Sequence, residues 1–302
     1  MIKQIYFAPL QGYTEAFYRR AHNAVIGGVA EYVTPFLRLE KNELRPKDLR
    51  ELGRAVHNPP NTVPQVLVKS PEELKTLIAP IAKAGYTKVD LNFGCPFPKV
   101  TQHGYGAGIL PFPDAIRSVL SELSQYPQIE FSVKMRIGLE SADELPPLIP
   151  LLNDAPLRHI VVHPRLGKQQ YSGDLDMESF RFFVQNSVHP VIYNGDIRTI
   201  EDALPYHDIM IGRGLLANPL LALEIKEGTI DAQSRLAFLL AFHKALVVEL
   251  QDIEQPLPKL KTIWDYFLPN AEPHLRKKLL KSRTLDDYLA IAPSVIESAI
   301  NS

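Results

Sequence analysis

The sequence predicts an α/β protein, namely a TIM (β/α)8 barrel followed by a small all-α domain. Eight short runs rich in β-branched and apolar residues recur through residues 1–229, and segments with helical periodicity separate them, as in the βα units of a parallel sheet. No Gly-x-Gly-x-x-Gly pattern follows the first run, which disfavours a doubly wound open sheet. After residue 229 only helical patterns remain.

The predicted elements alternate in order along the barrel. The strands are expected at residues 5–10, 32–36, 62–68, 88–93, 131–137, 159–164, 191–196 and 208–214. The helices are expected at residues 15–25, 71–84, 113–124, 142–153 and 177–186, with a short one after Thr199. Helical runs at 233–251, 259–267, 273–282 and 284–300 form the second domain, so we place a barrel at 1–229 and a helical domain at 230–302.

The composition is that of a soluble globular protein without metal or disulfides. The 302 residues carry 33 Lys+Arg against 34 Asp+Glu and are 45% hydrophobic. No apolar stretch approaches the ~18 residues of a transmembrane helix, and the apolar run at the start is too short for a signal peptide. Cys95 is the single cysteine, which excludes an intramolecular disulfide and Cys-rich zinc sites. We therefore expect a cytoplasmic protein that does not associate with membranes.

Local charge is less even than the net charge of -1 suggests. Residues 255–283 carry seven Lys and Arg against two acidic residues, a net charge of +5. This patch, which includes Lys277, Lys278 and Lys281, is a candidate phosphate-binding surface. Trp264, Phe267 and Leu268 have helical spacing in the same segment, and we expect them in the core rather than stacked on bases.

Active sites of such barrels lie at the carboxyl ends of the strands, and here those ends are polar. The glycines of Asn194-Gly195-Asp196 and Gly212-Arg213-Gly214 follow strands seven and eight, where barrels frequently bind phosphate. Arg213 adds a guanidinium for the same anion. Either glycine motif alone is as readily explained by a tight turn, but the two together favour a phosphorylated ligand.

Three further side chains are candidates for chemistry. Lys134 and Arg136 alternate along one strand and share a face, which is either the outside or the lumen; inside, the two cations need an anionic partner. Cys95 lies just beyond the fourth strand, where a thiol is either a buried inert residue, a nucleophile or a general acid. His163 either orients a ligand or satisfies a buried carbonyl, and the other histidines lack metal-ligand spacing.

Five segments in order resemble the tRNA-dihydrouridine synthases. They are Ala8-Pro9-Leu10-Gln11-Gly12-Tyr13-Thr14, Asp90-Leu91-Asn92-Phe93-Gly94-Cys95-Pro96, Ser132-Val133-Lys134-Met135-Arg136-Ile137-Gly138, Tyr193-Asn194-Gly195-Asp196 and Met210-Ile211-Gly212-Arg213-Gly214. The resemblance spans essentially the whole chain. It implies an FMN-dependent barrel and a helical tRNA-binding domain that together reduce the C5=C6 bond of a D-loop uridine, with NADPH or NADH as the reductant.

The resemblance also implies a role for each matching residue. Pro9, Leu10 and Gln11 would line the flavin, Gln65 would bind its pyrimidine edge, and Lys134 would lie near its reactive part. Asn92 and Arg136 would meet the uracil, and Cys95 would donate the proton to C5. The ribityl phosphate tail would be held by His163, Asn194, Gly195, Asp196, Gly212 and Arg213. The partner would be tRNA, bound by a monomer.

This chain departs from the usual pattern of the family at three places. Pro164 follows His163 where Gly or Ala is usual, and it removes an N–H that a phosphate would otherwise meet. Leu10 stands where Met is commoner, and Phe97-Pro98 replaces smaller or polar residues after Cys95. The first and third departures affect details of cofactor and substrate binding.

Two other functions remain open at this stage. The first is an FMN-dependent barrel oxidoreductase of a small pyrimidine, such as a dihydroorotate or dihydropyrimidine dehydrogenase, which the basic helical domain disfavours. The second is a tRNA-binding module without catalysis, which the presence of Cys95, Lys134 and Asn92 disfavours.

Overall fold

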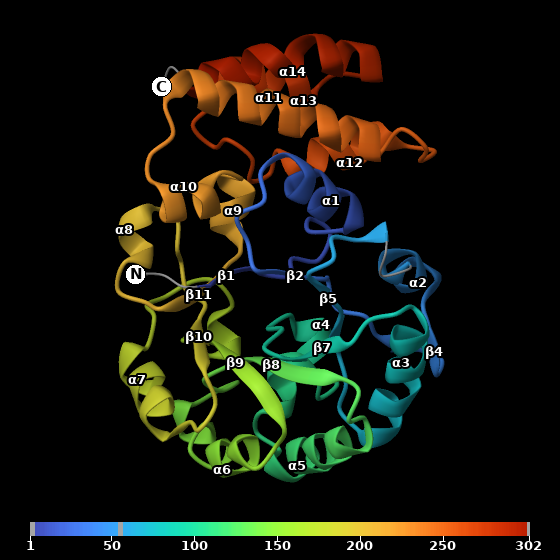
Figure 1. The fold of residues 1–302 in the computed structure, drawn as a ribbon, viewed down its shortest axis with the longest axis vertical. Helices are drawn as coiled ribbons and strands as arrows, with labels where there is room; N and C mark the ends of the chain where they lie inside the picture. The colour runs from blue at the N-terminus through green and yellow to red at the C-terminus, as the bar shows by residue number, and fades with distance from the viewer. Residues whose placement is uncertain (1–3, 54–56, 301–302) are drawn as a thin grey trace.

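The computed structural model describes residues 4–53 and 57–300, and it shows a parallel barrel ringed by helices with further helices stacked at one end (Figure 1). The sheet has the order β5-β2-β1-β11-β10-β9-β8-β7-β6, and its recorded pairs are parallel. Its strands are β1 (Gln4–Phe7), β2 (Glu31–Val33), β5 (Thr62–Val63), β6 (Gln65–Val66), β7 (Lys88–Phe93), β8 (Glu130–Arg136), β9 (Leu157–His163), β10 (Val191–Tyr193) and β11 (Asp208–Ile211). The predicted barrel fold is confirmed.

The barrel closes at Pro64. The strand expected at 62–68 is divided into β5, which pairs with β2, and β6, which pairs with β7. Proline has no N–H to donate to a ladder, so pairing changes sides at this residue. The Pro64 carbonyl still accepts from the Asp90 N–H, and a parallel bridge between Leu37 and Val66 spans the junction.

Most of the predicted helices are present, and one prediction is wrong. The helices found are α1 (Ala16–Val25), α3 (Pro71–Lys83), α5 (Pro113–Glu122), α7 (Met177–Asn186) and α8 (Ile200–Ala203). The single helix expected at 142–153 is instead a 3₁₀ turn, Ala142–Glu144, followed by α6 (Leu148–Asn153). Pro146 and Pro147 lie between them, and two prolines cannot continue a helical hydrogen-bond ladder.

The sequence patterns did not predict several short elements, because these elements are too short to show a hydrophobic periodicity. The segment after β2 forms a hairpin of β3 (Leu39–Glu40) and β4 (Glu43–Leu44), followed by α2 (Pro46–Leu52). The loops after β7 and β11 contain α4 (Pro98–Thr101), a 3₁₀ turn at Gly106–Ile109, α9 (Arg213–Ala217) and α10 (Leu221–Glu227). These pieces shape the end of the barrel where the strands finish.

The C-terminal region consists of α11 (Ala232–Glu249), α12 (Pro256–Ile263), α13 (Pro273–Leu280) and α14 (Leu285–Ile300). The second of these helices, α12, begins at Pro256 rather than residue 259, since proline is accepted in the first helical turn. Trp264, Phe267 and Leu268 are at most 5% exposed, which confirms them as core residues. Within the described ranges, no helix is long and apolar enough to cross a membrane.

The helical region is held against the start of α1. Lys259 pairs with Glu15 at 2.5 Å, Arg20 pairs with Glu249 at 2.6 Å, and the rings of Tyr18 and Phe242 meet edge to face. In Figure 1, α11 lies across α1 at the top of the barrel. Since α1 follows β1, this contact places the helical region beside the carboxyl ends of the strands. The predicted boundary at 229/230 falls between α10 and α11.

Candidate active site

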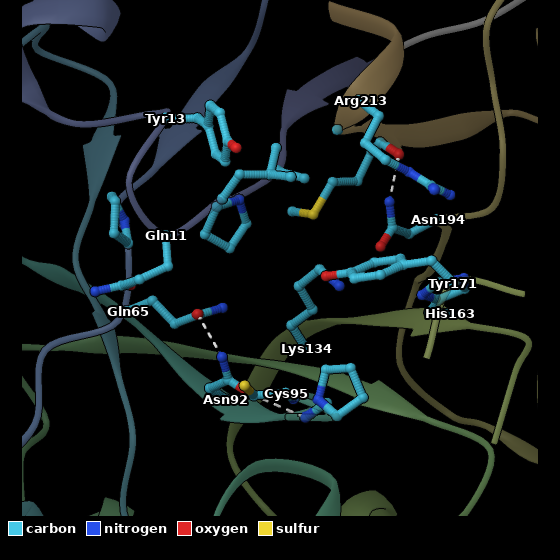
Figure 2. Close-up of a pocket in the computed structure, with 18 of the residues that line it drawn as sticks. Gln11, Tyr13, Gln65, Asn92, Cys95, Lys134, His163, Tyr171, Asn194 and Arg213 are labelled. Carbon is cyan, nitrogen blue, oxygen red and sulfur yellow. Dashed lines mark hydrogen bonds between the residues drawn. The ribbon is translucent and has the colours of Figure 1, made fainter. Parts of the chain in front are cut away.

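A cavity lies at the carboxyl ends of the strands, where the sequence predicted it (Figure 2). Its walls combine residues from β6, β7, β8, β9 and the loops that follow β1, β10 and β11. The predicted site residues that line it are Pro9, Leu10, Gln11, Gln65, Asn92, Cys95, Lys134, Arg136, His163, Asn194, Asp196, Gly212 and Arg213. The fold thus gathers residues that are more than 200 positions apart in the sequence.

The glycines after β10 and β11 have different structural reasons. Gly195 is not among the residues that line the cavity, and a Cβ there would lie 2.7 Å from the Tyr193 hydroxyl. A Cβ on Gly214 would lie 2.1 Å from the Ile197 carbonyl. Packing therefore explains both glycines, although Gly214 also lines the cavity. Gly212 does line the cavity, and a Cβ on it would meet only the side chains of Ala8 and Leu10, at 3.4 and 3.5 Å.

Lys134 faces the cavity without a fixed partner. Its ammonium makes no hydrogen bond and no ion pair with any residue that the structure describes. Burial lowers the Lys134 pKa to about 8, and the Arg136 charge adds to this, whereas Asp90 and Cys95 oppose it. A cation this desolvated favours an anionic ligand. Of the two faces that the sequence left open, Lys134 and Arg136 occupy the lumen side.

Arg136 is committed largely to the backbone. Its side chain donates to the carbonyl oxygens of Gly94, Leu166 and Gln170 at 3.0, 2.9 and 2.5 Å. It therefore ties the loop containing Cys95 to the loop after β9. Burial lowers the Arg136 pKa to about 10, so the guanidinium is charged at neutral pH. Two of its five N–H groups remain for a ligand.

Asp196 holds two arginines at the wall formed by the loops after β9, β10 and β11. Its carboxylate accepts from Arg165 at 2.5 Å and from Arg213 at 2.7 Å. Burial opposes its ionisation, but these cations hold the Asp196 pKa below the usual value. The Arg213 guanidinium also lies 4.7 Å from the centre of the Tyr171 ring. Arg213 is thus oriented before any ligand binds.

Cys95 is 7% exposed and keeps its proton at neutral pH. Burial raises its pKa, and the backbone N–H of Phe97 and the charges of Arg136 and Lys134 oppose the shift. Its loop is held because the Asn92 Oδ1 accepts from the N–H groups of Gly94 and Cys95, at 3.0 and 2.8 Å. The environment suits a thiol that donates a proton better than a thiolate that attacks.

His163 is buried and neutral. Burial lowers its pKa well below the usual value, and the cations around it lower it further. Its Nε2 lies 3.3 Å from the Nη1 of Arg165, which can only donate, so this nitrogen is the acceptor. The other ring nitrogen then carries the hydrogen and is a neutral donor.

Three tyrosines of the cavity were missed by the sequence analysis. Tyr171 lies in the loop after β9, which has no periodic pattern. Tyr266 comes from the helical region, and its ring meets that of Tyr13 edge to face at 4.9 Å. The Tyr13 hydroxyl donates to Asp265 at 2.9 Å. The helical region therefore supplies part of the cavity wall, which a division into separate domains does not suggest.

Some cations of the basic segment 255–283 have intramolecular partners, and the others lie on the surface. Lys259 pairs with Glu15, Lys261 donates to the Ser282 carbonyl, and Arg276 donates to the Trp264 carbonyl. The remaining cations line a surface hollow at α13 and the start of α14, and they are Lys277, Lys278, Lys281 and Arg283. These four residues form no ion pair within residues 4–53 and 57–300. His274 and Asp287 also line this hollow.

The parallel barrel with a cation-lined cavity at its strand ends defines an enzyme of the TIM-barrel class. A variant of NCR from Zymomonas mobilis has a similar fold, with a TM-score of 0.52 and 13% identity over 76% of this chain and 88% of that one. The family model for dihydrouridine synthase matches residues 6–267. The chain therefore belongs to the dihydrouridine synthase family.

Individual relatives agree with the family model. The tRNA-dihydrouridine(16) synthase of Pseudomonas syringae pv. tomato is 31% identical over 236 residues, which are 74% of each chain. The tRNA-dihydrouridine synthase B of Pasteurella multocida is 26% identical over 243 residues, which are 76% of this chain and 71% of that protein. Each similarity covers about three quarters of this chain.

Replacing Lys134 by Met should stabilise the ligand-free protein at neutral pH. A fall of the pKa from 10.5 to about 8 corresponds to roughly 3 kcal/mol, at about 1.4 kcal/mol per unit. Below pH 8 the folded state bears this full cost. Between pH 8 and 10.5 the unfolded state binds more protons, so wild-type stability rises with pH and the advantage of Lys134→Met shrinks.

Urea unfolding of both proteins across this pH range measures the difference. Lys75→Met, a change on the exposed face of α3, is the control and should show no such trend. A constant difference between wild type and Lys134→Met from pH 7 to 10.5 would contradict the lowered pKa.

Proposed function

We propose that the protein is a tRNA-dihydrouridine synthase that reduces the C5=C6 bond of a D-loop uridine, with FMN as cofactor and NADPH or NADH as reductant. The observation that carries this proposal is the cavity itself, where three side chains converge. They are Lys134, which has no ion pair among the described residues, the protonated Cys95 thiol and the oriented Arg213. Relatives named for position 16 support that uridine as the target.

The cavity residues fit FMN. The site requires an anion near Lys134, and Arg213 and the open wall at Gly212 suit a phosphate. Pro9, Leu10 and Gln11 provide a largely apolar wall for a flat ring, and Gln65 lines the same cavity. His163, Asn194 and Asp196 would complete the environment of the ribityl phosphate tail. Gly195 does not line the cavity and is explained by its packing against Tyr193. When bound, the flavin supplies hydride to C6 of the uracil.

The chain's own residues would orient the uracil and deliver the proton. The Cys95 thiol keeps its proton because burial raises its pKa, so it can act as the acid toward C5. The Asn92 Oδ1 accepts from the backbone, and one amide N–H of Asn92 donates to the Gln65 Oε1. The second amide N–H is left for the base. Arg136 retains two N–H groups for the same purpose.

The surface hollow on α13 would bind phosphates of the tRNA. Lys277, Lys278 and Lys281 have no recorded competing carboxylate partner in the described part of the chain, so their charge is free to attract an anion. We propose that the helical region 230–302 is the tRNA-binding domain and that the enzyme works as a monomer in the cytoplasm.

The small-pyrimidine alternative makes no use of this hollow. It also does not explain why the helical region contributes Tyr266 to the cavity wall. The direct test is to incubate the flavin-loaded protein and NADPH with tRNA that lacks dihydrouridine, and to map dihydrouridine by mass spectrometry. Product at position 16 supports the proposal, whereas reduction of free pyrimidines but not of tRNA would overturn it.

Replacing Arg213 by Ala should weaken flavin retention. The loss of a charged contact to phosphate corresponds to about 1.5–3 kcal/mol. Flavin released per mole of protein after dilution measures the change. Arg117→Ala removes an exposed arginine on α5 and should retain flavin as the wild type does. Equal retention in both variants would contradict the assignment of Arg213.

Neutralising Lys277, Lys278 and Lys281 together should weaken tRNA binding and reduce its salt dependence. Each lost phosphate contact should remove roughly 0.7–0.9 from the slope of log K against log salt. The matched control neutralises Lys75, Lys83 and Arg117, which are exposed on α3 and α5. A slope that falls equally in both triple variants would show that α13 has no special role.

Replacing Cys95 by Ala should slow the reduction of tRNA by about 10²–10⁴-fold, the usual effect of a positioned acid. Flavin binding and reduction of the flavin by NADPH should stay near wild type, because the thiol faces the base. Single-turnover oxidation of the reduced flavin by tRNA measures this step. Loss of the flavin would show that Cys95 is structural, and a wild-type rate would show that another group supplies the proton.

A further inference from the structure

A chain of buried hydrogen bonds leads from the barrel interior to the Cys95 loop. Asp90, 1% exposed on β7, accepts from Ser132 Oγ at 2.6 Å and from Gln65 Nε2 at 2.7 Å. The Gln65 Oε1 accepts from Asn92 Nδ2 at 2.7 Å, and the Asn92 Oδ1 accepts from the N–H groups of the Cys95 loop (Figure 2). Asp90 itself does not line the cavity.

The direction of this chain is determined at both ends. Backbone N–H groups can only donate, so Asn92 must turn its Oδ1 toward Gly94 and Cys95. Its Nδ2 then faces Gln65, which must present its Oε1 and turn its own Nε2 to Asp90. At that end a carboxylate accepts the last hydrogen bond. Either amide, if flipped, would set two donors or two acceptors against each other.

We propose that Asp90 is a positioning residue for the reaction, which acts through Gln65 and Asn92 to hold the loop that carries the Cys95 thiol. The proposal rests on the proposed function for the role of Cys95 as an acid. Asp90 does not line the cavity, and its side chain bonds to Gln65 and Ser132 rather than to the thiol. It supplies the acceptor that orients both amides. The register of the barrel supports this role, since Gln65 is paired with Asp90 and Asp90 with Ser132 in adjacent strands.

The thiol is a direct probe of the loop because Cys95 is the single cysteine of the chain. At 7% exposure, Cys95 reacts with iodoacetamide when its loop opens, so the rate of alkylation reports how firmly the loop is held. Intact-mass spectrometry of flavin-free protein follows this reaction without any need for activity.

Three variants separate the acceptor from the charge and from packing. Asp90→Ala removes the acceptor and should speed alkylation by about tenfold, the effect of leaving a buried amide without its partner. Asp90→Asn keeps an oxygen for Gln65 and can donate to the Ser132 hydroxyl, so it should stay within about twofold of wild type. Ser132→Ala removes the other partner of Asp90 and should also stay within about twofold.

Single-turnover oxidation of reduced flavin by tRNA gives the second measurement. Asp90→Ala should slow it by about tenfold, and Asp90→Asn should restore it, as expected for a displaced acid. Wild-type alkylation in Asp90→Ala, or equally fast alkylation in Asp90→Asn, would overturn the proposal. If Asp90→Ala does not fold, Gln65→Met breaks the same chain at its next link and must show the faster alkylation. If the wild type reduces no tRNA, the proposed function fails, whereas the alkylation rates still decide the role of Asp90.

Discussion

The parallel register of β7, β8 and β9 is the constraint on which the site depends. It places Asn92 opposite Lys134, and Arg136 opposite His163, with side chains of alternate residues facing the lumen. A shift of one residue in any of these strands would exchange the lumen and outer faces. The loop with Cys95 is attached to these strands through hydrogen bonds to Asn92 and Arg136.

The cavity contains several buried cations whose desolvation costs free energy. An anionic ligand would offset this cost. Lys134, Arg136 and Arg213 all line it, while Asp196 is used to hold Arg165 and Arg213. Burial lowers the pKa of Lys134 and Arg136, because it disfavours the charged form of each. Buried cations of this kind are typical of a binding site, where an anionic ligand can offset their desolvation free energy. In a protein core they would lower the stability.

The helical region takes part in the site as well as in the surface that we propose for tRNA. Tyr266 reaches the cavity, and Tyr13 connects the loop after β1 to Asp265. Asp265 and Tyr266 lie between Trp264 and Phe267 in the sequence. The side chains of Trp264 and Phe267 are buried and fix this segment in place. A tRNA held on α13 and a base held in the cavity would therefore both contact the helical region.

The sequence by itself determined the barrel, the helical region and most of the cavity, because strand periodicity and polar strand ends are local patterns. Parallel strands share one carboxyl edge, so residues at those ends, such as Asn92 and Arg213, had to meet. Only the tertiary structure decided how Pro64 divides a strand, that packing explains Gly195, that Arg136 is bound to three carbonyls, and that Tyr171 and Tyr266 reach the site. These features depend on contacts between distant segments, for which no periodic pattern exists in the chain.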